Sequence, residues 1–194
     1  MDESIEDNLA LLATDVDRYY ERLVLLYWHQ LRLFAIRRLG NAQDSEDVVQ
    51  EAFMRAYIAL ENYPLEQRRS LKARAWLYKI TWHLVCNHIN RAKTALLEPL
   101  DTSEESVLLE REDERSEDPE DLFEQVERRQ EVEALVSSLP PRYRTVVILY
   151  YFEDLTSQEV ADILNQPVGT VKVYVHRGIK LLRKALAVQV NNIG

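Results

Sequence analysis

Two clusters of basic residues have the composition needed to bind phosphate groups. The first spans residues 68 to 93, which carry seven lysines and arginines and no acid. The second spans residues 172 to 184, with five lysines and arginines, and no acid follows Asp162. A basic patch is the electrostatic footprint of nucleic-acid binding, although a single charged helix face is more often simply solvated. Phosphate binding is therefore the first chemistry to test, with a solvated surface as its alternative.

The overall net charge of -9 conceals these two clusters. Residues 1 to 97 carry 13 acids and 13 bases, residues 98 to 131 carry 15 acids and 4 bases, and residues 132 to 194 carry 5 acids and 7 bases. The central stretch also loses hydrophobic periodicity, as expected for a solvated linker with little stable helix. The charge pattern therefore predicts two folded blocks joined by an acidic linker.

Other site chemistries lack the residues they need. The single cysteine, Cys86, cannot form an internal disulfide, and we find no glycine-rich phosphate loop or carboxylate cluster for a metal. His83, Cys86 and His88 lie close in sequence, but the helical projection places His88 on the opposite face. We expect no bound metal, no cofactor and no enzymatic activity.

Amphipathic helices are expected to position the first cluster. Apolar residues recur at three- and four-residue steps from Tyr20 to Phe34, and Gly40-Asn41 supplies a stop. A second helix is expected to begin with Asp44 as its N-cap, and a third to run from about Lys72 to Arg91. The residues expected to be buried in these two helices are Val49, Ala52, Phe53, Ala56 and Leu60, then Ala73, Trp76, Leu77, Ile80 and Leu84.

The third helix also has an outward face in this projection. It carries Lys79, Trp82, His83, Cys86 and Asn90. An outward tryptophan beside a lysine suits the stacking of unpaired bases, which contributes about 1–3 kcal/mol per base. Packing of Trp82 under the linker or the N-terminal segment is the alternative explanation.

The second block is typical of a helix-turn-helix. Helices are expected over residues 129–138, 142–152, 156–165 and 168–188. Thr156-Ser157-Gln158-Glu159 fits a capping box, and Pro167 precedes a longer helix. A short helix, a tight turn and a longer basic helix is the arrangement that reads bases in the major groove. The longer helix is expected to bury Val171, Val175, Ile179, Leu182 and Leu186, and to expose Lys172, Val173, His176, Arg177, Lys180, Arg183 and Lys184.

The composition bounds the fold class. Only 4 glycines and 6 prolines in 194 residues, with no strand pattern, predict an all-α protein of two small helical domains, the second a helix-turn-helix. We expect no membrane insertion and a cytoplasmic location, because no apolar run is long enough to span a bilayer and the acidic start is unlike a signal peptide. The expected parts are an N-terminal extension at 1–14, a first domain at 15–93, a linker at 94–128, a second domain at 129–188 and a tail at 189–194.

Four segments together resemble one known family. They are DSEDVVQEAFMRAYIAL, WLYKITWHLVCNHINRAK, LPPRYRTVVILYYFEDLTSQEVADIL and GTVKVYVHRGIKLLRKAL. Their order and spacing are similar to those of bacterial extracytoplasmic-function (ECF) sigma factors, group 4 of the sigma-70 family. The resemblance implies a factor that directs core RNA polymerase to promoters and assists melting of the -10 region.

The resemblance also implies roles for particular residues. The acidic face of the second helix would bind core RNA polymerase through Asp44, Asp47, Gln50, Glu51 and Arg55. The first domain would bind the -10 element through Arg68, Arg69, Lys72, Arg74, Lys79, Trp82, His83 and Asn90, and the loop from Asn62 to Leu71 matches where family members capture a flipped base. The second domain would bind the -35 element through Thr170, Lys172, Val173, His176, Arg177, Lys180, Arg183 and Lys184. The remaining implied features are a linker that threads the polymerase, either as a nucleic-acid mimic or as a plain tether, and a cognate anti-sigma factor.

Some residues depart from the family pattern. His83 stands where asparagine is usual, and Val173 and Tyr174 stand where polar and basic residues are usual, so neither promoter element can be read from the sequence. Two other functions remain open on the residues alone. One is a stand-alone regulator that uses only the helix-turn-helix, and the other is a protein-binding decoy that recognises no promoter.

Overall fold

The computed structural model describes residues 9–10, 12–95, 132 and 134–193. These residues form helices and turns, and none of them lies in a strand. The chain divides into two compact units, residues 1–108 and 109–194. The prediction of an all-α protein with two small helical domains is confirmed. Most of the acidic linker predicted at 94–128 lies outside the described residues.

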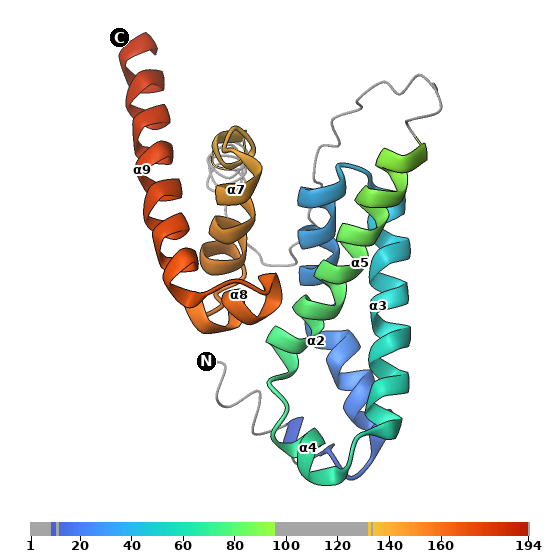
Figure 1. The fold of residues 1–194 in the computed structure, drawn as a ribbon. Coiled ribbons are helices and arrows are strands. Elements are labelled where there is room, and N and C mark those ends of the chain that lie inside the picture. The colour runs from blue at the N-terminus through green and yellow to red at the C-terminus, as the bar shows by residue number, and fades with distance from the viewer. Residues whose placement is uncertain (1–8, 11, 96–131, 133, 194) are drawn as a thin grey trace, which may run out of the picture. The chain divides into compact units, whose positions relative to one another are not determined.

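Three long helices make the first unit (Figure 1). They are α2 (Val16–Leu39), α3 (Ala42–Asn62) and α5 (Ala73–Ala95), and each packs against the other two. A five-residue helix, α4 (Leu65–Arg69), lies in the stretch that the sequence predicts as a loop. The three predicted long helices are therefore confirmed, and the connection before the third one is more ordered than expected.

The buried stripe of α3 follows the predicted spacing, whereas that of α5 is shifted. All five apolar residues predicted for the α3 core are buried. On α5, Leu77 and Leu84 are buried as predicted, but Trp76 and Ile80 are only half-buried. Because α5 contacts both α2 and α3, its buried face is wide enough to include Tyr78 and Thr81, which a single narrow stripe does not predict.

The ends of α2 and α3 are set by two adjacent residues. Gly40 adopts a left-handed conformation (φ 72°), and its amide donates to the Ile36 carbonyl at 2.8 Å, which ends α2 as predicted. Asn41 caps α3, since its Oδ1 accepts from the amides of Gln43 at 2.8 Å and Asp44 at 3.0 Å. The prediction that Asp44 is the N-cap is wrong. The helix starts immediately after the turn, and Asp44 lies in its first turn.

The last residues of the N-terminal extension include two buried side chains. Leu9 and Ala13 are buried, and the Ala13 amide donates to the Ala10 carbonyl at 3.3 Å. The sequence left open whether residues 1–14 dock on the first domain. Burial of these two apolar side chains shows that the end of the extension is docked, while residues 1–8 lie outside the described part of the chain.

The second unit is a compact arrangement of helices around one long helix. Its elements are α7 (Pro141–Val147), a π-helix η1 (Ile148–Phe152), α8 (Ser157–Leu164) and α9 (Val168–Ile193). Both α7 and α8 pack against α9 (Figure 1). The residues expected to form a tail, 189–194, continue α9 as far as Ile193.

The helix predicted at residues 142–152 changes its hydrogen bonding part-way along. The segment is α-helical up to Val147, and at its end the Glu153 amide donates five residues back to the Ile148 carbonyl at 3.1 Å. Single π-turns of this kind widen a helix locally and are frequent at functional sites. Here the π-turn sets the positions of Tyr150 and Tyr151.

Helices α7 and α9 pack tightly against each other at Gly178. A Cβ at this position would lie 2.6 Å from Val147 Cγ2 and 3.6 Å from Tyr143 Cβ. Val147 is itself buried, so it has little room to move aside. The glycine therefore allows the two helices to pack directly against each other.

We expect Gly178→Val to destabilise the second unit by about 1–3 kcal/mol, the usual cost of overpacking a filled core. Urea unfolding followed by circular dichroism measures the change. Combining it with Val147→Ala removes the methyl group in the way, so the double variant should recover part of the loss. Equal losses in the single and double variants would contradict this packing.

Candidate nucleic-acid interface

A helix-turn-helix is formed by α8, a three-residue turn and α9. The predicted capping box is present: Thr156 Oγ1 accepts from the Glu159 amide at 3.3 Å, and Glu159 Oε2 accepts from the Thr156 amide at 2.9 Å. At the other end of α8, Asn165 adopts a left-handed conformation (φ 50°) that turns the chain. Pro167 follows and directly precedes α9. These local signals fix both the start of α8 and the sharp turn into α9.

The rotation of α9 about its own axis is set by contacts on one side. Val171 is fully buried, and the Tyr174 ring meets that of Tyr143 edge to face, with centroids 5.4 Å apart. Gly178 lies against Val147. Of the predicted buried stripe, Val171 is confirmed. Val175, Ile179 and Leu182 are half-buried, and Leu186 is wrong, being 50% exposed. Leu186 lies two turns beyond Gly178 in the extended part of α9.

The opposite side of α9 is basic and exposed. The seven residues predicted on this face all have exposed side chains: Lys172, Val173, His176, Arg177, Lys180, Arg183 and Lys184. Thr170, the remaining predicted contact, is half-buried at the start of the helix. The structure thus brings the predicted set together on one helix, turned away from the core of its unit.

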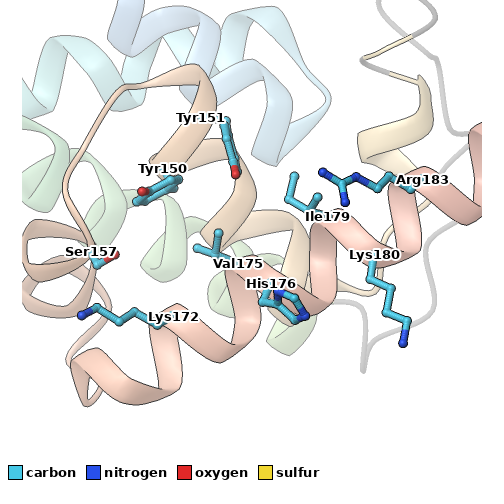
Figure 2. Close-up of a pocket in the computed structure, with 9 residues that line it drawn as sticks. All are labelled: Tyr150, Tyr151, Ser157, Lys172, Val175, His176, Ile179, Lys180 and Arg183. Atoms are coloured by element: carbon cyan, nitrogen blue, oxygen red, sulfur yellow. The ribbon is translucent and has the colours of Figure 1, made fainter.

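A groove of about 700 Å³ runs between η1 and the edge of this basic face. Figure 2 shows the cationic side chains extending from α9 and the tyrosine rings approaching from η1. Its lining residues are Tyr150, Tyr151, Ser157, Lys172, Val175, His176, Ile179, Lys180 and Arg183. The two tyrosines are not among the predicted site residues, because no sequence pattern marks the π-turn that positions them. The groove has the polar and aromatic groups to hold an anionic ligand.

The basic residues of the first unit lie on α4 and on α5 or just before it. Arg69, Lys72, Lys79, His83 and Asn90 are exposed, and Arg68 and Arg74 are half-buried. Part of the positive charge on α4 is neutralised locally, since Arg69 Nη1 lies 3.7 Å from Glu66 Oε1. The remaining exposed groups extend from the end of α4 along the length of α5.

Trp82 is turned further toward α2 than the projection predicts. Its ring is half-buried, with its centroid 6.5 Å from that of Phe34 and 5.2 Å from Cζ of Arg38. A tryptophan side chain is long enough to reach a neighbouring helix from the edge of a face. Among the described residues, its ring therefore contacts the end of α2, and the linker lies outside them. The prediction that Trp82 points away from the bundle is wrong, although part of its surface stays accessible.

The candidate polymerase-binding residues lie on one helix, and all of them except Asp44 are exposed. Asp47, Gln50, Glu51 and Arg55 are exposed on α3, and Glu51 and Arg55 form an ion pair one turn apart. Asp44 is only half-buried, and its Oδ2 lies 3.4 Å from Nε2 of His88 on α5. Asp44 therefore contributes to the contact between the first turn of α3 and α5, as well as to the acidic face of α3.

Two exposed apolar residues extend this face of α3. Met54 is 63% exposed and Ile58 is 56% exposed. Met54 lies one turn after the polar Gln50, and Ile58 lies one turn after Met54, so both continue the same face. Neither residue is among those predicted from the sequence. The available signal was their position outside the periodic stripe that places Phe53 in the core.

The cysteine and histidines of α5 do not gather into one site. His88 is turned toward Asp44, whereas His83 is exposed on the helix surface. Burial raises the pKa of the Cys86 thiol, and the nearby Arg38 charge offsets this only in part. A thiol of this kind is largely protonated near neutral pH and therefore a weak metal ligand. Within the described residues, no three His, Cys, Asp or Glu side chains are grouped as a metal site.

Two family models match the chain in succession. Sigma-70 region 2 matches residues 23–94, and Sigma-70 region 4 matches residues 129–182. The first match covers most of α2, all of α3 and α4 and nearly all of α5, and the second covers α7, η1, α8 and α9 as far as Leu182. This chain belongs to the sigma-70 family.

Two relatives of this sigma factor are ECF members. It is 33% identical to the ECF RNA polymerase sigma factor SigW of Bacillus subtilis (strain 168), over 84% of this chain and 87% of SigW. It is 30% identical to the ECF RNA polymerase sigma-E factor of Escherichia coli (strain K12), over 91% of this chain and 92% of that protein. It is therefore an ECF-type sigma factor, a transcription initiation factor rather than a member of an enzyme family.

Solved structures share its fold. The sigma factor RpoE from Bartonella quintana, co-crystallised with the anti-sigma factor NepR, matches with a TM-score of 0.68 and 22% identity, over 87% of this chain and 97% of that one. CnrH, solved in complex with the cytosolic domain of CnrY, matches with a TM-score of 0.61 and 22% identity, over 94% and 97% of the two chains. Among the described helices of the sigma factor, none is both long and apolar enough to cross a membrane.

Proposed function

We propose that this sigma factor is a dissociable specificity subunit of bacterial core RNA polymerase, in group 4 of its family. It directs the polymerase to promoters with defined -35 and -10 elements, assists melting at -10 and performs no covalent chemistry itself. It acts in the cytoplasm, where polymerase and promoters are found. The observation that carries the proposal is the exposed basic face of α9, held outward by Val171, Tyr174 and Gly178.

The -35 element is proposed to bind along α9. Exposed cations there contact phosphates, and those nearest the start of the helix reach base edges in the major groove. The residues proposed for this role are Thr170, Lys172, Val173, His176, Arg177, Lys180, Arg183 and Lys184. The linker predicted at 94–128 would then lead from this domain to the first one within the polymerase.

The -10 element is proposed to bind on α4 and α5. The basic track suits a single strand, and the accessible edge of Trp82 supplies an aromatic surface at its side. Contact with Arg38 and Phe34 holds this ring in one position, which favours an edge contact over full stacking. The residues proposed for this role are Arg68, Arg69, Lys72, Arg74, Lys79, Trp82, His83 and Asn90.

Core polymerase is proposed to bind the polar face of α3 together with Met54 and Ile58. Charged groups on this face, including Asp47 and Glu51, would set orientation and association rate, while the two exposed apolar side chains supply buried area. The complete proposed set is Asp44, Asp47, Gln50, Glu51, Met54, Arg55 and Ile58.

A cognate anti-sigma factor is proposed as a further partner. The structures of RpoE and CnrH with which this chain shares its fold were both solved as complexes, that of RpoE with an anti-sigma factor. Such a partner would cover the exposed surfaces described above until a signal releases it.

The polymerase-binding proposal is tested by competition for core polymerase against a labelled sigma factor. We expect Met54→Glu/Ile58→Glu to weaken competition by at least about tenfold, because two apolar contacts become charges that must lose their hydration. The matched control is Leu181→Glu/Leu186→Glu, which adds the same charge at exposed leucines of α9. Equal competition by the two double variants, with both folded, would exclude this face of α3.

A further inference from the structure

One apolar side chain interrupts the basic face of α9. Val173 is 45% exposed. Its neighbours on this face, the cations Lys172 and Arg177 and the imidazole of His176, are also exposed. Successive residues of a helix turn by about 100°, so Val173 projects almost opposite the buried Val171. Val173 therefore lies at the middle of the surface that α9 turns away from its unit.

The position of Val173 is fixed by the packing of its neighbours. Tyr174, the next residue, contacts the Tyr143 ring edge to face, and Gly178 lies against Val147. These contacts hold the first three turns of α9 and leave little freedom for rotation about its axis. The valine is thus presented at a defined point between the flanking cations.

A glycine lies on the same face one turn before Val173. Gly169 is exposed, and within the described part of the chain nothing outside the local helix backbone lies within 4 Å of where its Cβ would be. Its φ is not in the left-handed region, so neither space nor backbone conformation requires glycine there. Glycine is also a poorer helix former than alanine. What it does provide is a surface without a side chain, which allows another molecule to approach the helix backbone.

We propose that Val173 recognises the 5-methyl group of one thymine in the major groove of the -35 element, with Gly169 leaving room for the base edge. The major groove displays this methyl group only at thymine, and apolar side chains are the groups that contact it. Cations can bind phosphates or guanine but gain nothing from a methyl group. The inference rests on the proposed binding of α9 to the -35 element and assigns a T·A pair to one position within it.

The chain offers a matched control for this valine. Val132 is also 45% exposed and lies in the same unit, before α7. Scattered exposed valines are common on protein surfaces. Comparison of Val173→Ala with Val132→Ala therefore separates contact with DNA from general loss of a surface methyl group.

The test uses the full chain bound to core polymerase and promoter duplexes selected by that complex from a randomised -35 library. Each thymine of the selected element is replaced in turn by uracil, which removes only the methyl group. At one position we expect uracil to weaken binding about fourfold, as for one methyl-sized group withdrawn from water. Val173→Ala should bind the thymine and uracil duplexes equally, while Val132→Ala should behave like the unaltered protein.

A second variant tests the role of the glycine. Gly169→Ala should leave the thermal unfolding midpoint unchanged or higher and yet weaken binding to the selected duplex, because its methyl group occupies the space of the base edge. Binding equal to that of the unaltered protein would overturn this role.

The outcomes distinguish the two proposals. If the complex prefers the selected duplex but no uracil has an effect, or if Val173→Ala keeps the same sensitivity, the methyl contact is wrong and -35 binding stands. If the library yields no preferred -35 sequence, the proposed binding of α9 fails, and the inference fails with it.

Discussion

Replacing Lys172 and Arg177 with glutamate is expected to abolish initiation at the promoters that this sigma factor selects. Both side chains are exposed on α9, and neither takes part in the contacts that hold the helix. Loss of two groups that contact bases or phosphates costs about 2–6 kcal/mol, which is roughly 30-fold or more in affinity. The slope of log affinity against log salt should also become shallower by about 1.8. Run-off transcription and binding titrations at several salt concentrations measure both effects.

The matched control reverses the same amount of charge elsewhere. Arg18 and Arg22 are exposed on α2 and lie outside both basic clusters. If Arg18→Glu/Arg22→Glu lowers promoter affinity as much as the α9 double variant, net charge rather than the α9 face controls binding. Circular dichroism of both variants checks that each remains folded.

Replacing Phe53 with alanine is expected to have the largest effect on stability. Its side chain is buried in the first unit, stacked on the Trp28 ring at 5.7 Å and edge to face with Tyr20 at 6.2 Å. Truncation of such a residue costs about 3–5 kcal/mol, since it removes buried area and leaves a cavity. For a unit of this size the unfolding midpoint should fall by at least about 12 °C.

The adjacent residue provides the control for this substitution. Met54 follows Phe53 on α3 but is exposed, so Met54→Ala should change the free energy of unfolding by less than about 0.5 kcal/mol. Thermal unfolding followed by circular dichroism compares the two. A similar loss in both variants would contradict the assignment of Phe53 to the core.

Helical periodicity was sufficient to predict the core of α3 and the basic face of α9. In both helices a residue's face is decided by its spacing, so Phe53 and Lys172 lie where the projection places them. The capping box at Thr156 was likewise predictable, because it depends on residues three positions apart. These features need only local information.

Features set by tertiary contacts were not predictable in this way. Two good capping residues, Asn41 and Asp44, compete at the start of α3, and the turn made by Gly40 decides between them. Trp82 lies at the edge of its helix face, and its ring packs against Phe34 and Arg38 at the end of α2. The π-turn beside Tyr151 has no sequence signature at all.

Transcription by core polymerase on a pooled genomic promoter library tests the central claim most directly. Transcript starts would be sequenced with and without the full chain, and core binding would be measured in the same reaction. We predict discrete starts preceded by shared -35 and -10 elements at a fixed spacing, lost with Lys172→Glu/Arg177→Glu. Starts no different from those of core polymerase alone, despite binding, would contradict a role in promoter selection.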